Sequence, residues 1–213
     1  MKIGLVYGHV ASNIGDLCIN NGVATLLNDL FPNSKLHVVF RNPNEVYFED
    51  AKKTFEQHND VNFFNFNTPM DVAANIPLLK RYLNKPEDFL SDTGLSDCDV
   101  IFSNSGEFIF SYEDDPRLDL LWRLIPAIAS KAKDIRFLTL PSTLGPFEDE
   151  EGSNVVKNFL SLNDAYAVRD MQSMKHVTNL VNGDGASSSP QYTLVMCPHK
   201  SSRFKENFPK SVF

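Results

Sequence analysis

Four polar clusters in this chain of 213 residues carry groups that could bind an anion and remove a proton from a hydroxyl. Each cluster follows a predicted strand, and the four are 13–16, 104–107, 142–147, and Arg169-Asp170 with Ser173. The carboxylates of Asp16 and Glu107 could act as general bases, and the guanidinium of Arg169 could hold a phosphate or carboxylate through two hydrogen bonds. Chance turns would fall at both edges of a sheet. Because these four all follow strands and precede helices, we expect them at one edge.

The first cluster lies in a loop between the first predicted strand and a long amphipathic helix, whose leading N–H groups favour an anion. Gly8 and Gly15 are too widely spaced for the dinucleotide fingerprint G-x-G-x-x-G, and no Gly-Lys-Ser/Thr follows. Neither a Rossmann cofactor loop nor a P-loop is therefore predicted. Two interpretations stay open. The loop binds a ligand, with His9 donating to an anion, or it is a turn in which Asn13 or Asp16 caps the helix.

The rest of the chain alternates apolar strands with amphipathic helices. Strands are expected at 2–7, 36–40, 61–66, 99–103, 135–140 and 165–168, with one more at 192–197. A long helix is expected after the loop that ends at Asp16, with apolar positions from 19 to 30, and others at 45–58, 115–129, 153–162 and 171–177. Two prolines interrupt 69–92, so two short helices or an irregular excursion that covers one sheet edge are expected there. This alternation predicts an α/β fold with a three-layer, mostly parallel sheet and right-handed crossovers.

The composition changes after residue 181. Residues 182–190 contain two glycines and three consecutive serines, which is typical of a linker. The sequence therefore predicts a domain at 1–181, a linker at 182–190, and a segment at 191–213. That last segment either packs on the first domain as a tail or begins an incomplete second domain.

Composition and charge narrow the classes of function. The formal net charge of −7 argues against nucleic acid as a partner. Cys18, Cys98 and Cys197 show no C-x-x-C spacing, so we expect free buried thiols in a reducing compartment and no structural zinc. No leader pattern opens the chain, and no apolar run approaches the ~20 residues of a membrane span. These features predict a cytoplasmic protein.

Two of the clusters carry a resemblance to a known family. Residues 140–147, Leu-Pro-Ser-Thr-Leu-Gly-Pro-Phe, are similar to its Leu-Pro-Gln-Ser-Ile-Gly-Pro-Phe block, with Ser142 and Thr143 in place of Gln and Ser. Residues 168–173 are similar to its Val-Arg-Asp/Glu-x-x-Ser block. Together with Asn-x-Gly-Asp at 13–16 and the Asp-Gly-Ala at 184–186, these motifs resemble the polysaccharide pyruvyl transferase family over residues 1–186.

The resemblance implies one Rossmann-like half of a two-domain GT-B-type fold and a reaction that uses phosphoenolpyruvate as donor substrate. The pyruvyl group would move to a sugar as a cyclic ketal spanning two hydroxyls, with no metal or resident cofactor required. The implied catalytic residues are Asp16 and Glu107, although Glu107 could equally be a solvated turn residue. The implied substrate-binding residues are His9, Asn13, Gly15, Gly106, Ser142, Thr143 and Arg169.

The resemblance also implies that the chain is incomplete as an enzyme, because the family's other donor-binding residues lie in a second domain. A homo-oligomer that completes the cleft from a neighbouring copy is one way to restore activity. The expected partners are a small-molecule donor and a sugar or glycan acceptor. Two alternatives remain: a non-catalytic carbohydrate-binding domain, and half of a GT-B glycosyltransferase that uses a nucleotide sugar.

Overall fold

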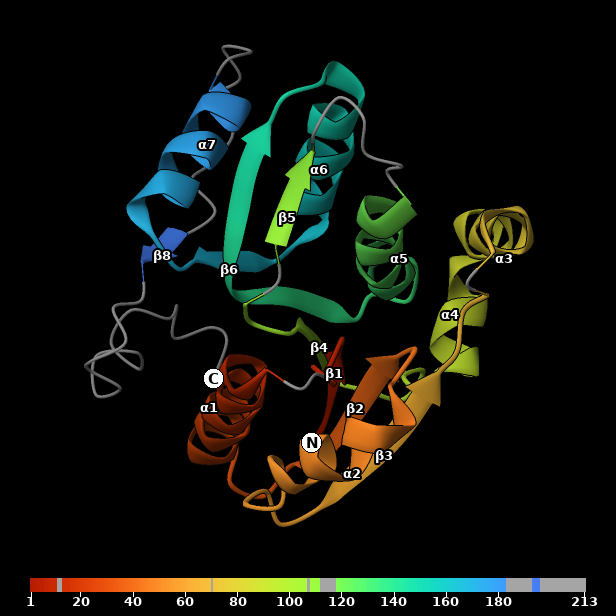
Figure 1. Cartoon of the computed structure of the whole chain (residues 1–213), viewed down its shortest axis with the longest axis vertical. Helices are drawn as coiled ribbons and strands as arrows, with labels where there is room; N and C mark the ends of the chain where they lie inside the picture. The colour runs from red at the N-terminus through yellow and green to blue at the C-terminus, as the bar shows by residue number, and fades with distance from the viewer. Residues whose placement is uncertain (11–12, 70, 107, 112–117, 183–192, 196–213) are drawn as a thin grey trace.

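A computed structural model describes residues 1–10, 13–69, 71–106, 108–111, 118–182 and 193–195 (Figure 1). The strands are β1 (Lys2–Val6), β2 (Lys35–Arg41), β3 (Val61–Phe66), β4 (Val100–Ser103), β5 (Phe108–Ser111), β6 (Arg136–Phe147), β7 (Ala165–Val168) and β8 (Thr193–Val195). The helices are α1 (Ile14–Leu30), α2 (Glu45–Lys53), α3 (Val72–Asn84), α4 (Pro86–Asp92), α5 (Leu118–Ala132), α6 (Glu150–Leu162) and α7 (Met171–Asn182).

The strands form one parallel sheet in the order β3-β2-β1-β4-β6-β7-β8, and β5 pairs with β6 outside this row. This is the Rossmann-like α/β arrangement that the sequence predicted. The chain winds from β1 toward β3 and then returns to the other side of β1 with β4. Ligands of such sheets bind outside the carboxyl ends of the strands at this reversal. The first and second polar clusters come after the two strands that meet there.

Helices cover both faces of the sheet, because strand side chains alternate between the faces. Ile3 and Leu5 of β1 pack with α1 and α2, whereas Val6 packs with the helices α3 to α7 on the other face. On that second face Phe66 meets Phe89 and Trp122 edge-on, with ring centroids 5.5 and 5.7 Å apart. These aromatic contacts attach α4 and α5 to the carboxyl end of β3.

The largest difference from prediction lies in β6, which runs on through the polar cluster at 142–147 instead of turning at residue 141. The first part of β6 pairs with β4, and from Thr143 onward its partner is β5. Figure 1 shows the bend in β6 and β5 lying beside its second half. The expected turn was wrong because its partner strand, Phe108–Ser111, is too short to stand out in the sequence.

Several boundaries also differ. α6 begins three residues earlier than predicted, because Asp149 accepts a hydrogen bond from Gly152 N at 2.7 Å and caps the helix. α2 ends at Lys53 and α7 continues to Asn182. Of the two alternatives for 69–92, the pair of helices is confirmed. Cys98 is buried as expected, but Cys18 is exposed, because it faces outward from α1.

The segment after the proposed linker contributes β8, which pairs in parallel with β7. The linker at 182–190 lies, apart from Asn182, outside the described residues, as do the predicted helix start at 115–116 and Glu107. The division into a domain, a linker and a further segment therefore stays a prediction.

Candidate functional site

Two buried asparagines fix the loop after β1. Asn20, on α1, accepts a hydrogen bond from His9 N at 3.0 Å and donates one to His9 O at 2.8 Å. Asn104, which comes after β4, donates to Tyr7 O at 3.1 Å and to Asn20 Oδ1 at 3.2 Å. Both asparagine side chains are fully buried. The backbone of residues 7–9 is therefore held from α1 on one side and from the neighbouring strand on the other.

The loops after β1 and β4 are joined to each other and to β6. His9 Nε2 lies 2.8 Å from Ser105 O and must donate, since a carbonyl only accepts. Ser105 Oγ and Gly106 N both donate to Pro141 O, at 2.5 and 3.1 Å. Gly106 has φ +82°, and a Cβ there would lie 2.5 Å from Ile19 Cδ1, so this close approach requires glycine. Because His9 Nε2 donates to Ser105 O, the Nδ1 atom of the neutral His9 imidazole can only accept a hydrogen bond.

Within the first cluster, Asn13 rather than Asp16 caps the helix. Asn13 Oδ1 accepts a hydrogen bond from Gly15 N at 2.9 Å, so the capping interpretation holds for Asn13. Asn13 and Gly15 are exposed, and Asp16 is partly exposed in the first turn of α1. The carboxylate of Asp16 therefore lies beside the helix N-terminus, where a negative charge is favoured.

The third cluster is more deeply placed than the sequence suggested. Ser142 is fully buried, and its Oγ donates to Leu140 O at 2.8 Å. Thr143 Oγ1 is also buried, and it has no hydrogen-bond partner in the described part of the chain. Gly145 has φ +87°, and a Cβ there would lie 2.5 Å from the His176 ring. The hydroxyl of Ser142 thus holds the bend in β6, whereas that of Thr143 retains its hydrogen-bonding capacity.

The fourth cluster ties α7 to β6. Asp170 Oδ1 accepts a hydrogen bond from Ser173 N at 2.7 Å and so caps α7. That bond is the main reason why the pKa of Asp170 lies below its usual value. Ser173 Oγ in turn accepts from Leu144 N at 3.0 Å. Arg169 N donates to Ser142 O at 3.2 Å, and its Nε lies 3.7 Å from Asp170 Oδ2, with both side chains about 40% exposed.

Three of the predicted clusters and His9 of the first loop therefore form one connected edge, to which residues 13–16 contribute none of the hydrogen bonds below. Its links are His9 to Ser105, Ser105 and Gly106 to Pro141, Ser142 to Arg169, and Leu144 to Ser173. The structure shows these hydrogen bonds, whereas none joins the Asp16 carboxylate to Arg169 within the described residues. Glu107 lies outside those residues.

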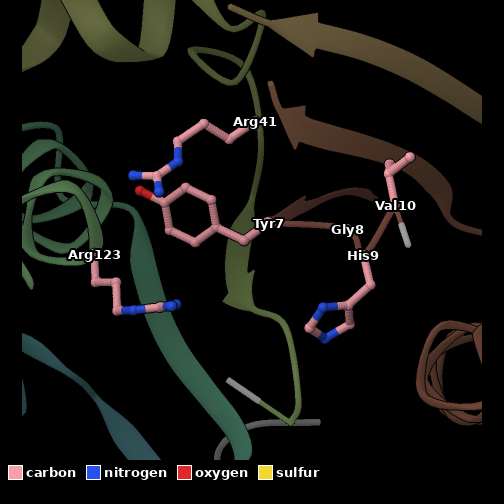
Figure 2. A pocket seen from close by; sticks show the side chains of 6 residues that line it. All are labelled: Tyr7, Gly8, His9, Val10, Arg41 and Arg123. Atoms are coloured by element: carbon pink, nitrogen blue, oxygen red, sulfur yellow. The ribbon is translucent and has the colours of Figure 1, made fainter. Parts of the chain in front are cut away.

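A pocket of about 190 Å³ opens beside this edge, and the sequence reasoning missed it. Its lining residues are Tyr7, Gly8, His9, Val10, Arg41 and Arg123. Figure 2 shows the side chains of His9 and Arg123 approaching the pocket from opposite sides, with the Tyr7 ring and Arg41 beside them. Arg41 ends β2, so the strand-end rule applied to the other clusters would have found it. Arg123 gave no such signal, because it lies within the mostly apolar helix α5.

The pocket concentrates positive charge. Burial lowers the pKa of Arg123 to about 10; the Tyr7 phenol acts to raise it and the nearby charge of Arg41 to lower it further. Arg123 still carries its charge at neutral pH. The Arg41 guanidinium lies 5.9 Å from the centroid of the Tyr7 ring and 5.8 Å from that of Trp122. Tyr7 OH donates to Trp122 O, which fixes the ring between the two cations.

Among the described residues, no three His, Cys, Asp or Glu side chains lie close enough to hold a metal ion. None of the helices in the same residues is long and apolar enough to cross a membrane.

Comparison with known proteins identifies the family. The sequence profile described as polysaccharide pyruvyl transferase matches residues 13–209, which is most of the chain. This chain belongs to that family. It is thus a polysaccharide pyruvyl transferase-like protein, as the motifs at 140–147 and 168–173 suggested. No curated protein sequence matches it.

Solved structures support the fold. The UDP-GlcNAc 2-epimerase of Neisseria meningitidis bound to UDP-GlcNAc aligns with 92% of this pyruvyl transferase-like chain at a TM-score of 0.52 and 12% identity. UGT89C1 of Arabidopsis thaliana complexed with UDP aligns with 92% at a TM-score of 0.45 and 10% identity, too weakly to carry an argument. The chain covers 46% and 48% of these two chains, so it spans about half of their length. Its fold is that of one GT-B-type half.

Proposed function

We propose that this chain forms the acceptor-side half of a protein that moves a pyruvyl group from phosphoenolpyruvate onto two hydroxyls of a sugar. The observation that carries the proposal is the hydrogen-bonded edge described above, in which the loops after β1, β4 and β7 connect with the middle of β6, where the family's block at 140–147 lies. This edge lies at the sheet's topological reversal, where ligands of such folds bind.

The chemistry requires a cation for the donor and a base for the acceptor. Protonation of the methylene carbon of phosphoenolpyruvate makes its neighbouring carbon oxocarbenium-like. One sugar hydroxyl adds to that carbon and loses its proton, inorganic phosphate leaves, and the second hydroxyl adds and loses its proton to close the ketal. In the proposal Asp16 takes a hydroxyl proton, with Glu107 as a second candidate base.

Arg169 is proposed to hold the phosphate or carboxylate of the donor. Its contact with Asp170 is exposed and therefore contributes little to stability. His9, Asn13, Gly15, Gly106, Ser142 and Thr143 are proposed to line the acceptor side. Thr143 is the best placed of the two hydroxyls, because that of Ser142 already binds Leu140 O.

We also propose that a second domain or a second copy of the chain completes the cleft. In this proposal residues 1–181 form the acceptor-side domain, 182–190 the linker and 191–213 the beginning of the second domain. The protein acts in the cytoplasm, where phosphoenolpyruvate is available.

The test is formation of a pyruvyl ketal. The purified chain, with its oligomeric state recorded, is incubated with labelled phosphoenolpyruvate and a mixed pool of sugar and glycan acceptors. Ketal formation and phosphate release should depend on both substrates. Asp16→Asn should lower the rate about 100-fold or more, as expected for loss of a general base. Asp29→Asn, at an exposed position on the same helix, is the matched control and should leave it unchanged.

Other results would contradict the proposal in different ways. Sugar binding without any binding of phosphoenolpyruvate would favour a non-catalytic carbohydrate-binding domain. Saturable binding of a nucleotide sugar would favour half of a glycosyltransferase. Robust ketal formation by a monomer would show that no second half is needed.

A further inference from the structure

The strand β3 forms an unpaired edge of the sheet. It is the last strand on its side, and within the described residues it pairs only with β2 (Figure 1). We propose that this edge is a contact between two copies of the chain, in which β3 of one copy pairs antiparallel with β3 of the other. The two sheets then form one continuous sheet with a two-fold axis at Phe63.

The hydrogen bonds to β2 show which backbone groups of β3 are left over. Leu36 N donates to Asp60 O at 2.8 Å. Asn42 N donates to Phe66 O at 2.9 Å. In a parallel pair, alternate residues direct their N–H and C=O groups to the same neighbour, so the even-numbered residues of β3 face β2. The odd-numbered residues face outward, and no described residue bonds to their backbone groups. They are Val61, Phe63 and Asn65.

One antiparallel register satisfies all the outward-facing groups. Residues that exchange both backbone hydrogen bonds recur at every second position of an antiparallel pair. If Phe63 lies opposite its own counterpart, Val61 lies opposite Asn65 of the second copy, and the reverse. Since each copy offers three donors and three acceptors, six hydrogen bonds between the copies can form. Any shift of the register leaves Val61 or Asn65 outside the paired region. The pattern of free groups on β3 thus matches a second copy of itself.

The side chains of β3 do not protect the edge. The strand reads VNFFNF and contains no charged residue and no proline, which are the residues that natural sheets place on exposed edges to prevent pairing. Asn62 and Asn65 are exposed but uncharged. Asp60, the charged residue before the strand, would lie opposite Phe66 of the second copy. The two Asp60 carboxylates therefore stay at opposite ends of the contact and do not repel each other closely.

The centre of the proposed contact is already ordered. The Phe63 ring packs against those of Phe40 and Phe55, with centroids 6.1 and 6.2 Å apart. Phe63 is nevertheless only partly buried, so part of its surface remains for the counterpart ring at the axis. Aromatic side chains directly opposite each other on adjacent strands stabilise a sheet. Because β3 is held in place before association, pairing orders little additional chain.

The contact has a consequence for the cleft. A two-fold axis through Phe63 and perpendicular to the sheet reverses the strand direction, so the carboxyl ends of the strands in the two copies point in opposite directions. The copy bound at β3 therefore does not complete the cleft at its partner's polar edge. The β3 contact is independent of the proposed function, and ketal formation neither requires it nor tests it.

Sedimentation velocity of the purified chain over a wide range of concentrations tests the contact. We expect monomers and dimers without larger species, because a two-fold contact is closed. Asn65→Pro removes an outward-facing N–H and keeps the bonds to β2, so it should raise the dissociation constant of the dimer about 10-fold or more. Asn65→Ala is the matched control. It removes the same side chain but keeps the N–H, and the dissociation constant should stay within about 3-fold of the parent's.

Hydrogen exchange followed by mass spectrometry locates the contact. The amides of residues 61–66 should gain protection as the concentration of the parent chain rises. The proposal is overturned by a chain that stays monomeric, by open-ended aggregates, or by a dimer in which these amides gain no protection. A dimer unaffected by Asn65→Pro overturns it too, as does full protection in the monomer, which would mean that another segment covers the edge. If circular dichroism shows that Asn65→Pro does not fold, Asn65→Lys replaces it, because a charge on the edge should also weaken the dimer.

Discussion

Replacement of Asn20 by alanine should destabilise the protein and loosen the loop after β1. The side chain is fully buried and takes part in three hydrogen bonds, two with the backbone of His9 and one with Asn104. Each such bond contributes about 0.5–1.5 kcal/mol net, and a donor left buried without a partner costs more. Alanine's better helix propensity returns about 0.5 kcal/mol. The expected loss in free energy of unfolding is therefore about 2–3 kcal/mol.

Asn21→Ala is the matched control, because it makes the same change at the next position of α1, where the side chain is exposed. Its expected effect is within about 0.5 kcal/mol of zero. Urea unfolding monitored by far-ultraviolet circular dichroism gives both values. A loss below about 1 kcal/mol for Asn20→Ala, or equal losses for the two variants, would refute the idea that Asn20 holds this loop.

Two further substitutions test how the bend in β6 and the start of α7 are held. Gly145→Ala should lower the free energy of unfolding by about 1–3 kcal/mol, because φ is +87° and the new Cβ would lie 2.5 Å from His176. Gly22→Ala is the control, because Gly22 lies on α1 with open space around it, and it should raise the free energy of unfolding by about 0.5–1 kcal/mol in the same urea assay. Asp170→Ala should cost about 1 kcal/mol at neutral pH through loss of the cap to Ser173. Since the folded-state pKa of Asp170 lies below its ordinary value of 3.8, its stabilisation is present above that pH and fades as the pH falls through the folded value. The difference in free energy of unfolding between Asp170→Ala and the parent should therefore become smaller in acid. A difference that stays constant down to pH about 2 would contradict the capping role.

The sequence was enough to predict the alternating elements and the positions of the first and fourth polar clusters after their strands. Apolar runs such as those of β3 and β7 and turn residues such as Asn13 act locally, so their effect can be recognised without knowing the fold. The parallel sheet was predictable from the alternation. The same logic placed His9 and Arg169 after strands, and the structure has them there.

Features that depend on pairing between distant segments were missed. Whether β6 turns or continues at residue 141 depends on β5, which lies more than thirty positions earlier and is only four residues long. The pocket beside the loop after β1 is lined by Arg41 and Arg123, which come from β2 and from α5. The spacing of the two arginines in the sequence does not show that their side chains line the same pocket. Arg123 was also concealed by its apolar neighbours on α5, among them Trp122.

The structure changes how the family's motifs are understood in this chain. Asn13 caps α1, Ser142 holds the bend of β6, and Asp170 caps α7. These motif side chains position the backbone, so substituting them changes stability and activity together. Arg41 and Arg123 lie outside the motifs and line the pocket with their charged groups. The motifs therefore account for the backbone of this edge, whereas the charged groups that line the pocket come from other parts of the chain.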